Sequence, residues 1–152
     1  MSYCTREEVR ALLKLDAVSQ IITDNDGVED PEEREAILAP LIEEAIADAD
    51  GEIDGYLAKR YTVPITPVPK VISKFSKDIA LYNLFSRAGL DKDGREGNYL
   101  TRYNAAIKFL TLVAEGKVSI GTEASDPVTA AETGFALHSN GRIFSRDQMQ
   151  GM

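Results

Sequence analysis

The stretch that most restricts the possible folds of this chain runs from Leu41 to Tyr61, LIEEAIADADGEIDGYLAKRY. Apolar residues recur in and just before it at the spacing of one helix face, without the alternation of a strand. They are Leu38, Ile42, Ala45, Ile46, Ala49, Ile53, Tyr56 and Leu57. The other positions include six acids and no base between Leu41 and Ala58, namely Glu43, Glu44, Asp48, Asp50, Glu52 and Asp54. A helix with one apolar stripe needs companions to cover it, so this stretch predicts a helical bundle.

The rest of the chain supplies companion helices. Thr5 and Glu8 have the spacing of a capping box, which predicts a short helix over 6–15, and a second apolar group, Val18 to Ile22, follows. Residues 70–87 and 98–115 also carry their apolar side chains on one helical face, and Gly116 is placed as the C-terminal cap of the latter.

Two proline features set boundaries. Pro40 interrupts the helix predicted to begin at Pro31, so either a short helix ends near Leu38 or a longer one bends there. Thr62 to Pro69 holds three prolines in six residues, which forbids a helix and predicts an extended corner between two helices. A P-x-x-P ligand motif is the weaker interpretation of this stretch. The expected fold is therefore all-α, a bundle of about four to five helices with a Pro-rich corner.

The chain after this bundle has a different character. We expect residues 1–121 to form the bundle domain, with a brief strand possible at Lys117 to Gly121, and residues 122–152 to form a flexible or extended arm. Asn140-Gly141 suits a tight turn, so a short β-hairpin is one option there. The arm regains apolar side chains, which makes it a candidate for docking on a partner or for folding back on its own bundle. These candidates are Phe135, Leu137, Ile143, Phe144 and Met149.

Charge is divided unevenly along the sequence. Residues 1–58 carry 16 acids and 4 bases, residues 59–120 carry 5 acids and 11 bases, and residues 121–152 carry 4 acids and 2 bases. These give net charges of −12, +6 and −2, which account for the total of −8. The two larger parts can attract each other within one subunit or between subunits, and the charge sums alone favour neither.

Motifs that carry chemistry are scarce. In the loop DNDGVEDPEE the EF-hand frame places Ile22, which has no ligand oxygen, at the first ligand position, so a turn followed by a cap at Asp30 is favoured over calcium. The loop from Gly89 to Gly97 mimics a phosphate-binding loop but has Arg95 and Glu96 where Lys and Ser/Thr belong.

Catalysis is equally poorly supported. His138 is the single histidine, and Cys4 has no base near it in sequence, so we expect no enzyme, no metal and no cofactor. The net acidic chain does not favour specific DNA binding. One cysteine excludes an internal disulfide and fits a reducing compartment, no apolar run is long enough for a membrane span, and the start MSYCTREEV has no apolar export signal.

Several pieces of the sequence, in this order, resemble one family. They are the opening MSYCTREE, the helix ADADGEIDGYL at 47–57, RYTVP at 60–64 with the Pro-rich corner, GKVSIG at 116–121 and RIFSRD at 142–147. In these pieces the chain resembles the small Mu-like phage and prophage proteins encoded among head and neck genes. That family is in turn similar to helical head–tail connector adaptors, and no catalytic residues come with it. Residues 122–133 align with nothing in this resemblance.

The resemblance implies a structural protein of the virion neck, present in the bacterial cytoplasm during assembly. It would form a ring under the portal protein, meet a tail-joining protein below, and continue a channel that DNA crosses without specific binding. As a subunit in solution it could be a monomer. Glu43, Glu44 and Asp48 are the candidates for an acidic lumen that repels the DNA backbone. The alternative is a monomeric helical binding module or assembly chaperone that is absent from the finished particle.

Overall fold

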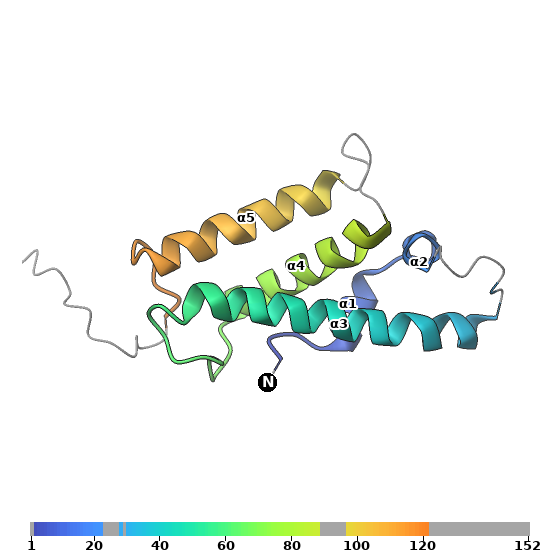
Figure 1. Ribbon diagram of the computed structural model, residues 1–152, viewed down its shortest axis with the longest axis horizontal. Coiled ribbons are helices and arrows are strands. Elements are labelled where there is room, and N and C mark those ends of the chain that lie inside the picture. The colour runs from blue at the N-terminus through green and yellow to red at the C-terminus, as the bar shows by residue number, and fades with distance from the viewer. Residues whose placement is uncertain (1, 23–27, 29, 89–96, 122–152) are drawn as a thin grey trace, which may run out of the picture.

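The computed structural model describes residues 2–22, 28, 30–88 and 97–121. Five α-helices and no strand occur in this part of the chain, which confirms the predicted all-α class (Figure 1). In chain order they are α1 (Arg6–Leu12), α2 (Leu15–Ile21), α3 (Pro31–Leu57), α4 (Lys70–Ala88) and α5 (Gly97–Ala114).

Helix α1 begins at the predicted capping box. The Glu8 amide donates to Thr5 Oγ1 at 3.3 Å, and the Thr5 amide donates to Glu8 Oε2 at 3.0 Å. The helix ends at Leu12 rather than at Leu15, because Leu13 adopts an extended backbone and its side chain is buried in the core. Helix α2 starts after this break and buries Val18 and Ile21.

Helix α3 is one continuous element of 27 residues, so of the two alternatives at Pro40 the longer helix is present and none ends near Leu38. Asp30 caps it as predicted, accepting from the Glu32 amide at 3.1 Å, and Pro31 occupies the first turn. Pro40 removes one backbone donor, which leaves the carbonyl of Ala36 without its helical partner. Ala36 and Pro40 both lie on the exposed side, where water can satisfy that carbonyl while the apolar stripe on the opposite side holds the helix together.

The Pro-rich corner connects α3 to α4 without a helix or strand. It contains cis peptide bonds at Val63-Pro64 and Thr66-Pro67, and it buries Tyr61 and Ile65 against the bundle. The expected corner between two packed helices is therefore present.

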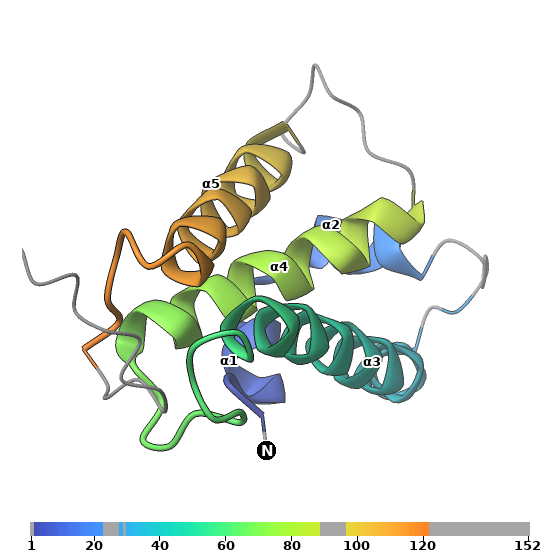
Figure 2. The same cartoon turned by 60° about the vertical axis from the view of Figure 1, so that its left-hand side comes forward.

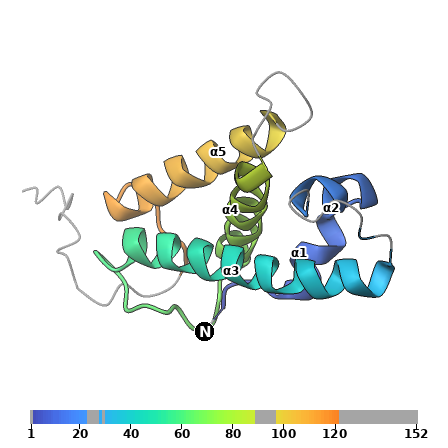
Figure 3. The same ribbon diagram turned by 45° about the vertical axis from the view of Figure 1, so that its right-hand side comes forward.

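Helix α4 lies between the other long helices and contacts both α3 and α5 (Figures 1 and 2). Helix α1 packs against α3 and α4, and α2 packs against α4, near the end of the molecule where α3 begins (Figure 3). The fully buried side chains from these helices form one core: Val9, Leu38, Ile42, Ile53, Leu57, Ile72, Ile79, Leu110 and Val113.

Stacked rings join α4 to α5. The ring centroids of Tyr82 and Tyr103 are 4.1 Å apart, and those of Phe85 and Tyr99 are 4.2 Å apart. Aromatic pairs of this kind add roughly 0.5–1.5 kcal/mol beyond the apolar area that they bury.

Helix α5 ends at the predicted glycine cap. The Gly116 amide donates to the Val113 carbonyl at 3.0 Å and the Lys117 amide donates to the Leu112 carbonyl at 2.9 Å, which is the hydrogen-bond pattern of a Schellman motif. Gly116 has the positive φ of 80° that this motif requires. The brief strand considered at 117–121 is wrong, because these residues form a bend that places Ile120 in the core.

Other predicted features fall outside the described residues. They are the loop at 23–27, the phosphate-loop mimic at 89–96, His138, and the arm at 122–152 with its hairpin. Within the described part, no helix is long and apolar enough to cross a membrane.

Candidate functional site

The three predicted lumen residues lie on two sides of α3. Glu43 Oε1 accepts from Arg6 Nη1 of α1 at 3.1 Å. Glu44 and Asp48 instead line a shallow hollow beside α4, together with Asn83 and Arg87. All three carboxylates are exposed, but the structure does not bring them together on one surface.

The uneven charge of the sequence is present on the surface of the fold. The exposed acids of α1 and α3 and of the cap before α3 are Glu7, Glu8, Asp30, Glu32, Glu33, Glu35, Glu43, Glu44 and Asp48. The exposed bases after α3 are Lys59, Lys70, Lys74, Arg87, Lys108 and Lys117. Within 58–88 and 97–121, Glu115 is the one exposed acid, and Asp78 is buried.

Ion pairs inside the subunit use part of this charge. Arg10 Nε donates to Glu35 Oε2 at 2.9 Å, and Lys77 Nζ of α4 lies 3.4 Å from Glu8 Oε1 of α1. The Thr5 amide and Lys77 lower the pKa of Glu8. Exposed pairs of this kind contribute at most about 1 kcal/mol each, so packing rather than charge holds the bundle together.

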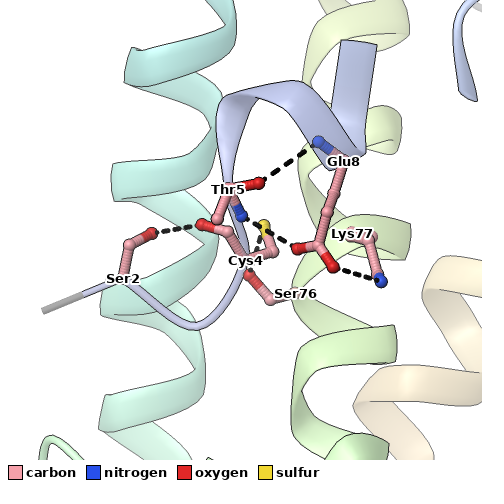
Figure 4. A network of polar contacts seen from close by, with 6 residues as sticks. All are labelled: Ser2, Cys4, Thr5, Glu8, Ser76 and Lys77. Carbon is pink, nitrogen blue, oxygen red and sulfur yellow. Dashed lines mark hydrogen bonds and ion pairs between the residues drawn. The ribbon is translucent and has the colours of Figure 1, made fainter. Parts of the chain in front are cut away.

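The first residues of the chain form a polar cluster between α3 and α4 that sequence patterns did not predict (Figure 4). Ser2 Oγ donates to Asp50 Oδ2 at 2.7 Å, and the Tyr3 amide donates to Asp50 Oδ1 at 3.2 Å. The buried hydroxyl of Ser76 on α4 lies 3.1 Å from both Asp50 Oδ1 and Cys4 Sγ. Asp50 thereby ties the start of the chain to two helices.

Tyr3 extends this cluster to the Pro-rich corner. Its hydroxyl donates to Asp54 Oδ1 on α3 and accepts from the Ile65 amide at 3.1 Å. Burial, followed by the hydrogen bond to Asp54, raises the pKa of Tyr3 to about 12. The side chain is 3% exposed, so this phenol acts as a neutral structural link.

Cys4 occupies the apolar part of the same region. It is 3% exposed, and burial raises the pKa of its thiol. A reactive cysteine needs access and a lowered pKa, and this site provides neither.

Asp78 is a buried charge that the helix pattern did not reveal. Its side chain is fully buried on α4, where it pairs with Lys74 Nζ at 2.8 Å and with Arg102 Nη2 of α5. Removing one partner of such a pair destabilises the fold by more than the intact pair stabilises it, because a buried charge then remains uncompensated. Asp78 therefore fixes α5 on α4.

The described residues contain no group of three or more His, Cys, Asp or Glu side chains arranged to hold a metal ion. The five arm residues proposed for docking, Phe135, Leu137, Ile143, Phe144 and Met149, lie outside the described part. The best-defined candidate for function is therefore the charged outer surface of α3 and the basic surface after it.

Comparison with known proteins identifies the family of this chain. Residues 3–138 match the family described as Bacteriophage Mu, Gp36. The chain is 32% identical over 110 residues to the Mu-like prophage FluMu protein gp36 of Haemophilus influenzae, covering 72% of this chain and 74% of that protein. It is 30% identical over 110 residues to gene product J of Escherichia phage Mu, covering 71% of this chain and 73% of that protein. The chain belongs to the bacteriophage Mu Gp36 family.

Proposed function

We propose that this protein is a structural subunit of the phage neck that forms a ring between the portal protein and a tail-joining protein. The observation that carries the proposal is the separation of exposed charge in an all-α bundle, with acids on α1 and α3 and bases on the chain after α3. A subunit with two complementary surfaces favours a head-to-tail contact, which closes into a ring when the rotation between copies is suitable. Membership of a phage family is consistent with this role.

The channel of such a ring must let DNA slide. A carboxylate surface repels the phosphate backbone over roughly a Debye length, about 8 Å at physiological salt. Glu43 pairs with Arg6 on one side of the outer surface of α3, and the hollow of Glu44 and Asp48 lies on the other side. We assign the side of Glu43 to the channel. Glu43→Lys should slow DNA ejection from assembled particles and Glu43→Gln should slow it less. Equal ejection by the Lys variant and the unaltered protein would remove the channel assignment.

The decisive experiment for the ring is direct. Particles produced from the corresponding phage genome are purified, and the chain is quantified against the portal protein by mass spectrometry, with cryo-electron microscopy of the neck. The proposal expects a fixed stoichiometry and density for a helical ring below the portal. If the chain is needed for assembly but absent from finished particles, it is an assembly chaperone instead.

A further inference from the structure

One side of α3 faces outward between two hollows. One is the hollow of Glu44 and Asp48 beside α4, and the other is a hollow that Ala47 and Gly51 share with residues 2–6. Glu44, Asp48, Gly51 and Gly55 follow one another at intervals of four, three and four residues, so they share one side of the helix. All four are exposed, as is Ala47 between them. We call these five residues the outer face of α3.

Nothing in the described part of the subunit requires glycine at the two glycine positions of the outer face. They lie inside a continuous helix, where glycine is a poorer helix former than alanine. A Cβ atom at either position would meet no described atom within 4 Å, and neither glycine has a positive φ. Their lack of side chains does, however, let a second polypeptide approach the backbone of α3 closely.

Charge selects the partner for this face. Glu44 and Asp48 give it negative charge, with Arg87 of α4 at the edge of their hollow. The complementary surface lies where α3 and α5 end (Figure 1), and we call Lys59, Arg60 and Lys117 the basic end. Arg60 there donates to the Val113 carbonyl at 3.4 Å, and Glu115 pairs with Lys117 at 2.7 Å. Among the described residues of this end, the bases outnumber the one acid, Glu115, so the basic end is positive.

We propose that the outer face of α3 docks onto the basic end of a second copy of this chain. The two surfaces differ, so the contact is heterologous and each copy keeps one of each surface for a further neighbour. This inference rests on the proposed ring and identifies the surfaces through which its subunits meet. Glu43, which pairs with Arg6, borders this face beside Ala47 and Gly51 and is not one of the contact residues.

A zero-length cross-link between a carboxylate and an amine tests the contact. Full-length chains labelled with ¹⁴N and ¹⁵N are mixed, treated with a carbodiimide and mapped by mass spectrometry, and purified particles are treated in parallel. Mixed-isotope peptides report contacts between copies. We expect links from Glu44 or Asp48 to Lys59 or Lys117, in the concentrated protein, in the particles or in both.

Two variants of matched size sharpen the test. A Cβ at Gly51 would meet no described atom within 4 Å, so the subunit should fold as Gly51→Leu while these links decrease by about tenfold or more. Ala105→Leu adds similar volume to an exposed position on α5 and should leave the links unchanged. Circular dichroism of both variants checks folding.

Several results would overturn the contact. They are mixed-isotope links confined to other surfaces, links insensitive to Gly51→Leu, or no such links in either preparation. A chain present in particles without links at α3 would refute this contact and leave the proposed ring intact. A chain absent from particles would refute the proposed function whatever the free protein does.

Discussion

At the scale of single residues, Tyr3 has a structural role that its position near the start of the sequence does not suggest. Its hydroxyl joins Asp54 of α3 to the backbone of the Pro-rich corner, and its ring is part of the core. Sequence periodicity locates helix faces but gives no information on a residue outside the helices. The sequence placed Asp50 and Asp54 among the acids on the polar side of the helix, whereas in the structure they accept hydrogen bonds from Ser2 and Tyr3.

Replacing Tyr3 by Phe should destabilise the fold by about 1–3 kcal/mol, because the Asp54 carboxylate and the Ile65 amide both lose a partner. Urea unfolding monitored by circular dichroism measures the change. Tyr99→Phe is the control, since Tyr99 stacks on Phe85 and its hydroxyl has no hydrogen bond among the described residues. Equal effects of the two changes would show that the Tyr3 hydroxyl is not a structural link.

The same phenol predicts sensitivity to alkaline pH. Burial and the hydrogen bond to Asp54 raise the pKa of Tyr3 from 10.0 to about 12, and burial with the hydrogen bond to Glu52 raises that of Tyr103 to about 12. The folded state thus holds these protons more tightly than the unfolded state. The resulting stability is full below pH 10 and is lost as the pH rises from 10 towards 12.

Ultraviolet absorbance during a pH titration follows the ionisation directly. Tyr3 and Tyr103 should ionise well above pH 10, together with the loss of helical signal. Tyr3→Phe and Tyr103→Phe should each remove one late step. Early ionisation of all six tyrosines in the folded protein would contradict the environments described for these two.

At the scale of elements, helix faces were well predicted and helix ends less so. The last two helices, predicted over 70–87 and 98–115, occupy Lys70–Ala88 and Gly97–Ala114. Their apolar stripes and the Gly116 cap are local signals, which a sequence carries completely. The break at Leu13 was not predicted, and the sequence left open whether α3 continues through Pro40, because each depends on what the rest of the fold covers.

Three glycines should respond to alanine in opposite directions. Gly51→Ala and Gly55→Ala should each stabilise the free subunit by roughly 0.5–1 kcal/mol, since both positions are helical and open. Gly116→Ala should destabilise it, because its φ is 80° and the new Cβ would lie 3.0 Å from Arg60 Nη1. Thermal unfolding of the three variants gives the order. A loss of stability at position 51 or 55 would mean that the subunit itself needs the glycine.

At the scale of the whole molecule, the fold class followed from the sequence but the surfaces did not. Six acids on one predicted helix indicated an acidic surface. In the structure Glu43 lies on a different side of the helix from Glu44 and Asp48. Asp50 and Asp54 accept hydrogen bonds from Ser2 and Tyr3. Asp78 is a second example, because its burial depends on Arg102 of a different helix. Which charges remain available to a partner can be read only from the packed structure.

The bundle should be independent of the last residues. The described core is complete by Ile120, so a chain ending at Gly121 is expected to keep the helical signal and unfolding midpoint of the full chain. Circular dichroism during thermal unfolding of the two chains makes the comparison. A clearly lower midpoint for the shorter chain would show that residues 122–152 fold back on the bundle.

The anchoring of residues 2–4 also orders events during synthesis. Tyr3 and Cys4 are translated before their partners Asp50, Ile65 and Ser76, which follow tens of residues later. Residues 2–4 can therefore make these contacts only after α4 has emerged. A bulky group attached directly before Ser2 is therefore expected to hinder this late step of folding.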